Sequence, residues 1–314
     1  MRKNGAETTA PLISRIINGT PSPYAFVPIS DFSFTADSIR IREYTGYAND
    51  EFYSEYLLSD VVYNLDNAGF DSHGPGNEAL REIVRDKHIV KKRFLLGTDR
   101  FGRDMLSRMI LGTRISLSVG FIAVTISLLV GILLGGLAGF YRGWIDKFIM
   151  WFVNVIWSVP TLLMVIAITI VLGKGYWQVF IAVGLTMWVE VARVVRGQVL
   201  SIREKEYVEA ARAVGMHPMR VLFVHILPNV LSAVAIISAA NFATAILLEA
   251  GLSFLGIGVQ PPVPSWGAMI KEHYGYIIVN KGYLAFIPGS AIMLMVLSFT
   301  MVGNGLRDSL DTRG

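Results

Sequence analysis

The stretch that decides the fold is ISLSVGFIAVTISLLVGILLGGLAGF, residues 115–140, which contains no charged side chain. A helix needs about 20 apolar residues to cross the hydrocarbon layer of a membrane, so this run predicts a transmembrane helix. Four more apolar runs follow, at residues 148–172, 177–192, 230–257 and 283–304. The sequence therefore predicts five spans. Buried helices of a large soluble core are the alternative, which five long runs with short connections disfavour.

The run at 177–192 is the weakest of the five because Glu190, Arg193 and Arg196 enter its end. Long charged side chains near a helix end can extend to the membrane interface. We therefore still expect this segment to span the membrane.

Composition divides the chain into two regions. Of 314 residues, 53% are hydrophobic and 17% are charged, whereas soluble domains are about a quarter charged. Up to Arg108 the chain carries 14 of its 28 basic and 15 of its 24 acidic residues. The absence of cysteine excludes disulfides, thiolate metal sites and thiol catalysis. An ordinary soluble enzyme is not expected.

The polar region, residues 1–93, predicts a small mixed α and β segment of unassigned fold. Its signals are an aromatic-rich stretch at 24–34, a helix at 50–64, a turn at 73–76 and a charged helix at 78–92. Residues 94–314 form the second expected domain, which holds the spans.

Basic residues between the spans predict the orientation, since cytoplasmic loops are rich in Lys and Arg. One side carries Arg142, Lys147, Arg193, Arg196, Arg203, Lys205, Arg212, Arg220, Arg307 and Arg313. The other side carries Lys174, Lys271 and Lys281. The loop at 193–220 and the C-terminus are therefore expected in the cytoplasm. Five spans then place residues 1–93 outside, although residues 1–96 hold no apolar run that would export them.

Motifs for catalysis or cofactor binding are missing from the sequence. It has no G-x-x-x-x-G-K-[ST] phosphate-binding loop. The histidines at 73, 88, 217, 225 and 273 lack the spacing that metal sites need. No catalytic, cofactor-binding or metal-ligating residue is predicted.

The loop YVEAARAVGMHPMRVLFVHILPN, residues 207–229, predicts a helix, a glycine corner and a second helix. Gly215 is a natural left-handed stop for a helix, and Pro218 suits the first turn of the next one. Small Ala210 and Ala211 would let another surface approach, with Glu209 and Arg212 as charged anchors. A solvated basic loop is the alternative.

This loop resembles the EAA loop of bacterial ABC importer permeases, which docks on the ATPase subunit. The resemblance rests on six residues: Glu209, Ala210, Ala211, Gly215, Leu227 and Pro228. Arg212 and His225 are also assigned to this coupling loop. His225 stands where the general pattern has Ile, but HILPN, residues 225–229, is similar to the peptide and nickel branch of the family.

Two further segments resemble the same branch, most closely the C-type subunit of dipeptide and oligopeptide importers. The segment LGTDRFGRDMLSR, residues 96–108, is similar to its signature before the membrane, and EAGLSFLGIGVQPPVPSWG, residues 249–267, to an external loop. The signature residues are Gly97, Thr98, Asp99, Gly102, Arg103, Asp104, Glu249, Ser265 and Trp266. We expect Asp99, Arg103 and Asp104 to form a local charge network.

The resemblance implies an all-α polytopic membrane protein with a type I importer helical bundle in a prokaryotic inner membrane. The implied function is ATP-driven import of di- or oligopeptides without catalysis by this chain. The implied partners are a homologous second permease subunit, two ATPase subunits that hold ATP and Mg, and an extracytoplasmic binding protein. The alternatives are a nickel-chelate or other small-solute importer, an ATP-independent carrier and a non-transporting scaffold. Nucleic acid is not an expected partner.

Family members have six spans, one before the external segment, so we expect a further apolar span before residue 1. Within the spans, Gly131, Gly135 and Gly139 lie on one helix face and predict close helix packing. Pro160 and Pro288 are expected to interrupt two spans, as pivots or kinks. Glu249 either contacts a peptide amine or braces the loop at 265–266, and Asn241 is a second candidate for the substrate path.

Overall fold

The computed structural model describes residues 26–44, 52–62, 77–173, 175–261 and 263–310. The chain forms two compact units, Met1–Leu106 and Ser107–Gly314, which are described one at a time. The expected turn at 73–76, Lys174 and Arg313 lie outside the described residues.

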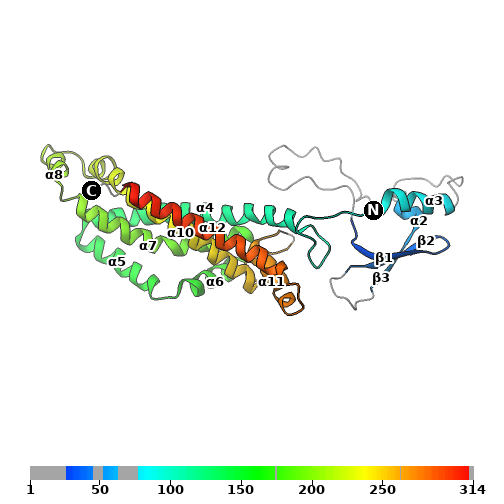
Figure 1. Ribbon diagram of the computed structural model, residues 1–314. Coiled ribbons are helices and arrows are strands. Elements are labelled where there is room, and N and C mark those ends of the chain that lie inside the picture. Colours follow the sequence, from blue (N-terminus) through cyan, green and yellow to red (C-terminus); the bar gives the residue numbers. More distant parts are fainter. Residues whose placement is uncertain (1–25, 45–51, 63–76, 174, 262, 311–314) are drawn as a thin grey trace, which may run out of the picture. The chain divides into compact units, whose positions relative to one another are not determined.

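The first unit contains a three-stranded antiparallel sheet in the order β1-β2-β3 (Figure 1). The strands are β1 (Ile29–Phe34), β2 (Ser38–Glu43) and β3 (Tyr53–Leu57), and the helices are α2 (Leu58–Val62), α3 (Asn77–Ile83) and the π-helical η1 (Val84–His88). In the register of β2, Ile41 lies opposite Phe32, and Ile39 lies opposite Tyr56. Ile39 and Ile41 are buried in a cluster with Leu58, Leu80 and Val84. The expected small mixed region is confirmed.

The expected helix over residues 50–64 is wrong for residues 53–57, which form β3. β2 is the central strand, so its backbone needs a partner on each side, and β3 supplies the second one. Tyr53 and Tyr56 also favour a pleated surface. Only residues 58–62 are helical in the described part of this segment. The charged helix is found as α3 and η1, which end at His88.

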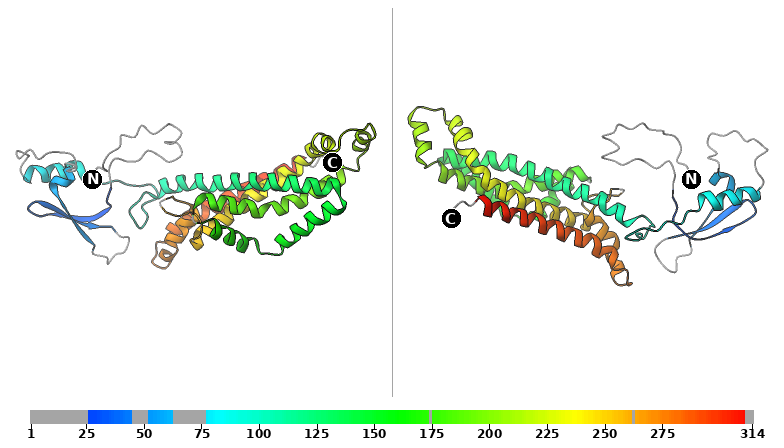
Figure 2. Two further views of the ribbon diagram at one scale, coloured as in Figure 1. Left: turned by 180° about the vertical axis from the view of Figure 1, so that it is seen from behind. Right: turned by 45° about the horizontal axis from the view of Figure 1, so that its top comes forward.

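The second unit is built from helices (Figures 1 and 2). They are α4 (Met105–Tyr141), α5 (Gly143–Trp157), α6 (Thr161–Leu172), α7 (Tyr176–Ile202), α8 (Glu206–Ala213), α9 (Pro218–Arg220), η2 (Val221–Ile226), α10 (Leu227–Leu255), α11 (Trp266–His273), η3 (Tyr274–Ile277) and α12 (Tyr283–Leu310). Four helices of the described residues are long and apolar enough to cross a membrane: Met105–Tyr141, Tyr176–Ile202, Pro218–Leu255 and Tyr283–Leu310. A fifth span results if α5 and α6 are taken together.

The second apolar run is interrupted at Pro160 as expected, since α5 and α6 are bent by 90° relative to each other. The bend lies at Ser158, Val159 and Pro160, where proline removes a backbone donor. Pro288 acts differently from the expectation, since α12 continues through it. Membrane helices tolerate proline where neighbouring groups satisfy the freed carbonyl.

Helix α7 lies at the centre of the bundle. In its most apolar stretch of 18 residues 67% of the residues are buried, against 17% in the corresponding stretch of α12. The expected glycine contacts are made with α7. A Cβ at Gly131 would lie 2.5 Å from the Val191 side chain, and a Cβ at Gly135 would lie 2.4 Å from the Ala192 carbonyl. The glycine face therefore lets α4 and α7 pack backbone to backbone.

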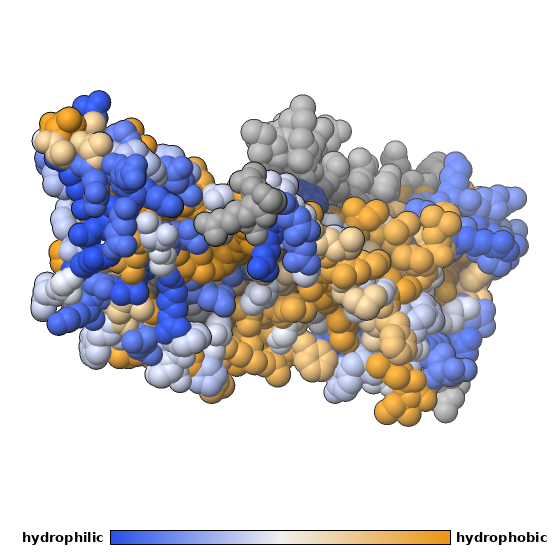
Figure 3. Space-filling view, turned by 60° about the vertical axis from the view of Figure 1, so that its left-hand side comes forward, coloured by the Kyte–Doolittle hydropathy of each residue, from blue (hydrophilic) through white to orange (hydrophobic). Residues whose placement is uncertain are grey.

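The surface of this unit is divided by polarity. The end that carries α8 is mostly hydrophilic, and the flanks of the helices are mostly hydrophobic (Figure 3). Exposed apolar side chains on the flanks include Phe121, Leu129, Phe148, Ile170, Phe286 and Met301. Such flanks suit lipid or the membrane helices of another subunit.

Candidate functional site

The loop between α7 and α10 contains the expected helix, glycine corner and second helix. Gly215 has φ +77°, in the left-handed region. Its N–H donates to the Arg212 carbonyl at 2.9 Å, and the N–H of Met216 donates to the Ala211 carbonyl at 3.2 Å. These two bonds form a Schellman motif, which satisfies the last carbonyls of α8. Pro218 then lies in the first turn of α9, where no backbone donor is needed.

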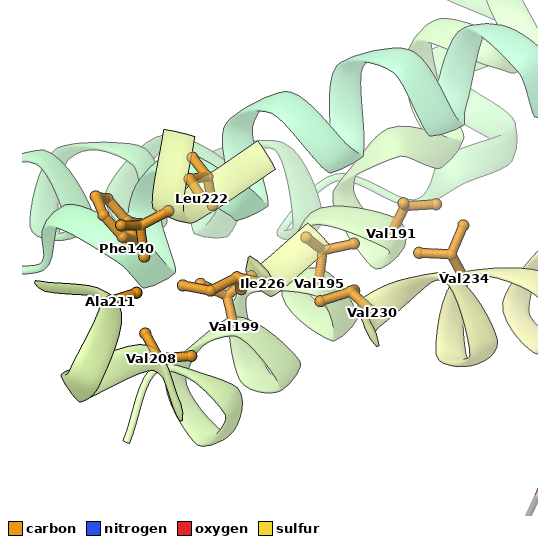
Figure 4. Close-up of a cluster of buried hydrophobic side chains, with 11 residues drawn as sticks. Phe140, Val191, Val195, Val199, Val208, Ala211, Leu222, Ile226, Val230 and Val234 are labelled. Carbon is orange, nitrogen blue, oxygen red and sulfur yellow. The ribbon is translucent and has the colours of Figure 1, made fainter. Parts of the chain in front are cut away.

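One face of α8 is buried in the bundle. Val208 is 0% exposed and Ala211 is 7% exposed. Both belong to a buried cluster with side chains of α4, α7, η2 and α10: Phe140, Val191, Val195, Val199, Val221, Leu222, Ile226, Val230 and Val234 (Figure 4). The expectation that Ala211 faces a partner is therefore wrong, because its methyl group fills a position in the core of its own chain. The small residue allows α8 to lie close to that core.

The opposite face of α8 is exposed. Glu209 and Ala210 lie on it as expected, and Arg212 is partly buried at its edge. Four large apolar side chains of this loop are also exposed: Tyr207, Val214, Phe223 and Val224. Ala210 has a small side chain and lies beside Glu209 and the exposed apolar side chains. Another protein can therefore approach the backbone of α8 closely at this surface.

Polar contacts fix this loop to the corner between α4 and α5. Arg203 Nη1 donates to the Phe140 carbonyl, and Arg142 forms an ion pair with Glu204. The Arg212 guanidinium lies 5.2 Å from the centroid of the Phe140 ring. Burial, with the nearby charges of Arg142 and Arg212, lowers the pKa of Arg203 below its ordinary value. These contacts join Arg212 of α8 and the segment before α8 to the end of α4 and the corner that follows it.

The remaining predicted loop residues continue into α10. His225 is partly buried in η2, and its carbonyl accepts a hydrogen bond of 2.8 Å from Asn229 Nδ2. Leu227 packs against the buried cluster, and Pro228 lies in the first turn of α10. Residues 209–228 thus form one structure around a shared core.

A second group of predicted residues lies at the other end of α10. Glu249 is 0% exposed, and its Oε1 accepts a hydrogen bond of 2.7 Å from Ser253 Oγ. Ser253 Oγ in turn accepts one of 3.0 Å from the N–H of Val259. This chain of bonds holds the start of the loop that follows α10, so the geometry supports a bracing role for Glu249.

The same loop is fixed at its other end by α11. Ser265 Oγ accepts from the N–H of Ala268 at 3.2 Å and caps this helix. Trp266 Nε1 donates to the Met109 carbonyl of α4 at 3.0 Å. A Cβ at Gly267 would lie 2.4 Å from the Ala250 carbonyl, so α11 lies directly against α10. Asn241 is buried in α10, and its Nδ2 has no hydrogen-bond partner among the described residues.

The signature before the membrane forms a tight turn in the first unit. Asp99 accepts hydrogen bonds from the N–H groups of Phe101 and Arg103 and from Arg103 Nε, the last at 2.6 Å. Gly97 and Gly102 have φ values of +71° and +68°, in the left-handed region. The backbones of Thr98 and Asp104 form an isolated antiparallel β-bridge. Asp104 accepts from the N–H of Leu106 at the start of α4. The expected pairing of Asp99 with Arg103 is present.

Comparison with known proteins identifies the family. The model of the binding-protein-dependent transport system inner membrane component matches residues 131–313. The chain belongs to this family. It is thus a multi-pass membrane permease subunit of an ABC importer, and it is not an enzyme, since ATP hydrolysis in these importers lies in partner subunits.

Relatives of this permease cover most of its length. The dipeptide transport system permease protein DppC of Alkalihalophilus pseudofirmus is 43% identical over 69% of this chain and 71% of its own. The oligopeptide transport system permease protein OppC of Bacillus subtilis is 40% identical over 69% and 71%. The glutathione transport system permease protein GsiD of Pectobacterium atrosepticum is 40% identical over 69% and 72%.

The fold of the permease is also found in a solved structure. An inward-facing conformation of the MetNI methionine ABC transporter matches with a TM-score of 0.55 at 17% identity. The match covers 65% of this chain and 97% of the other. It confirms the type I importer bundle expected from the sequence.

Sequence reasoning missed the residues that anchor the loop of this permease. Phe140, Arg142 and Arg203 lie far from it in sequence or outside its motif, and no local pattern joins them to α8. Val208 and Ala211 did carry a signal, because apolar residues three apart lie on one helix face.

Proposed function

We propose that this permease is the subunit of an ATP-driven importer of di- or oligopeptides. The names of its relatives support this substrate class, since they are permeases of dipeptide, oligopeptide and glutathione transport systems. The observation that carries the role is the α8 structure, which is buried on one face, exposed on the other and held by a Schellman corner.

In this proposal the exposed face of α8, with Glu209 and Ala210, docks on a cytoplasmic ATPase subunit. The basic residues around α8 support a cytoplasmic location for this helix and for the C-terminus. Closure of the ATPases on ATP pushes α8. Because Val208 and Ala211 are embedded in the core shared by α4, α7 and α10, the push moves these spans as a body. The bundle then switches between inward- and outward-facing states, each favoured by its own ligand.

A second, homologous permease subunit completes the path in this proposal. The largely exposed surface of α12 supports this second subunit. A translocation path must be surrounded by protein, and a single chain whose spans bury so few residues does not surround one. An extracytoplasmic binding protein delivers the peptide, and two ATPase subunits hold ATP and Mg.

The test is uptake of labelled trialanine by the assembled importer in proteoliposomes, with the binding protein outside and ATP inside. We expect uptake that requires ATP and the binding protein. Uptake without ATP would support an ATP-independent carrier, and ATP-dependent transport of a nickel chelate but no peptide would support the other solute class. Either result would overturn the proposal.

A further inference from the structure

Arg193 is a charged residue inside a candidate span, α7. Its Nη2 donates to Asn154 Oδ1 at 2.7 Å, and its guanidinium carbon lies 3.4 Å from the centroid of the Trp157 ring. Its Nε is buried and has no hydrogen-bond partner among the described residues. No carboxylate of the described residues forms an ion pair with it. Arg193 therefore has no carboxylate in direct contact and one buried donor without an acceptor, which is costly.

Arg196, one turn later on α7, has its charge balanced by a carboxylate. Its Nε and Nη2 donate to the two carboxylate oxygens of Asp146 at 2.5 and 2.7 Å. This fork-to-fork geometry is typical of a structural ion pair. The two arginines thus share a helix and face the same neighbour, α5, but only Arg196 has an acid there.

Arg193 does not extend to the cytoplasmic end of α7. It lies nine residues before Ile202, or roughly 13 Å along the helix axis. It contacts Asn154, whereas Arg196 contacts Asp146, two turns earlier in α5. Helical side chains lean toward the N-terminus of their helix, and that end of α7 is the one away from α8. The guanidinium therefore points along α7 away from α8 and toward the bend between α5 and α6.

The bend between α5 and α6 lies beside this arginine, because Trp157, which its guanidinium contacts, is the last residue of α5. Asn154, Trp157, Ser158 and Pro160 are all exposed on this chain. Non-helical backbone at membrane depth is tolerated only within protein or along a water-filled cavity, and the same holds for an ionised side chain. Both features favour a surface that faces protein or water over one that faces lipid.

We propose that Arg193, Asn154 and Trp157 form a binding site in the translocation path for the carboxylate of the transported peptide. The guanidinium presents donors in a planar fork that matches a carboxylate. Trp157 stacks on the guanidinium, and Asn154 fixes its orientation. This inference rests on the proposed peptide importer, whose substrates share a C-terminal carboxylate.

The experiment compares two probes, trialanine and its C-terminal amide, in the assembled importer with the binding protein saturated by each. We expect the wild type to favour the acid about tenfold in kcat/KM, the effect of one hydrogen bond to a charged group. In Arg193→Gln the ratio of acid to amide falls to about one. Arg193→Lys keeps the positive charge and restores part of the ratio.

Arg196→Gln is the matched control, since it breaks a structural ion pair on the same helix. We expect it to lower the stability of the importer and to leave the ratio of acid to amide as in the wild type. A wild type that transports neither probe would refute the peptide importer itself. A wild type that transports both without discrimination would refute only the carboxylate site.

Two other outcomes would overturn the site. An equal loss of acid and amide transport in Arg193→Gln would mean that Arg193 pairs with an acid of the partner permease. A loss seen only in vesicles that contain phosphatidylglycerol, and absent in phosphatidylcholine alone, would mean that Arg193 binds a lipid phosphate.

Discussion

Gly215 ends α8 with φ +77°, a conformation that disfavours residues with a Cβ. A Cβ built at this position has no atom within 4 Å. Replacement therefore costs only the backbone term, roughly 1 to 2 kcal/mol for an ordinary residue in the left-handed region. Gly215→Val should cost at least this much because Val is β-branched, and Gly215→Asn should cost less because Asn tolerates this region.

The direct assay is amide hydrogen exchange in the assembled importer. A loss of 1 to 2 kcal/mol corresponds to a factor of about 5 to 30 in local opening. The N–H groups of residue 215 and Met216 form the Schellman bonds, so they should lose protection by this factor in Gly215→Val. ATP hydrolysis stimulated by the binding protein should fall in the same variant, and Gly215→Asn should lie between Val and wild type.

Wild-type protection and coupling in Gly215→Val would refute the corner as the element that holds α8. Equal loss of coupling in the Val and Asn variants, without loss of amide protection, would move the cause to side-chain bulk at the docking surface. The empty space around Gly215 within this chain makes these two causes separable.

Three further perturbations test other parts of the structure. Gly135→Val should disrupt packing of α4 on α7, since its Cβ would lie 2.4 Å from the Ala192 carbonyl, whereas Gly136→Val should be tolerated because its nearest neighbour is Leu227 Cδ2 at 3.6 Å; equal yields of folded permease would contradict this. Trp266→Phe removes one of the donors to the Met109 carbonyl, which still accepts from Thr113 Oγ1, and should lower the free energy of unfolding by about 0.5 to 1.5 kcal/mol; unchanged resistance of the permease to denaturant would argue against the contact. The chain has no native cysteine, so Lys281→Cys and Arg212→Cys should react with an impermeant maleimide from opposite sides of the membrane; reaction from one side would refute the topology.

Much of this fold follows from the sequence because membrane helices are determined by local composition. The runs at 115–140 and 283–304 exceed the membrane thickness and contain no competing charge. Gly215 and Pro218 specify the loop corner through backbone geometry alone, which needs no tertiary context.

Other features depend on contacts that no local pattern encodes. β3 forms because β2 needs a second partner, and this overrides the helical expectation for residues 53–57. The 90° bend at Pro160 and the continuous helix at Pro288 come from the same residue type in different surroundings. The inward position of Ala211 depends on Phe140 and Leu222, which lie in other elements.

The central claim is that the exposed face of α8 docks on the ATPase, and adjacent alanines test it most directly. Ala210 is exposed, and its neighbour Ala211 is buried in the core. In the assembled importer, Ala210→Cys should form a cross-link to the ATPase subunit with a short bismaleimide, and ATP should change its yield. Ala211→Cys should form none. Equal cross-linking from both positions, or none from Ala210→Cys in an importer that still hydrolyses ATP on stimulation, would contradict the account.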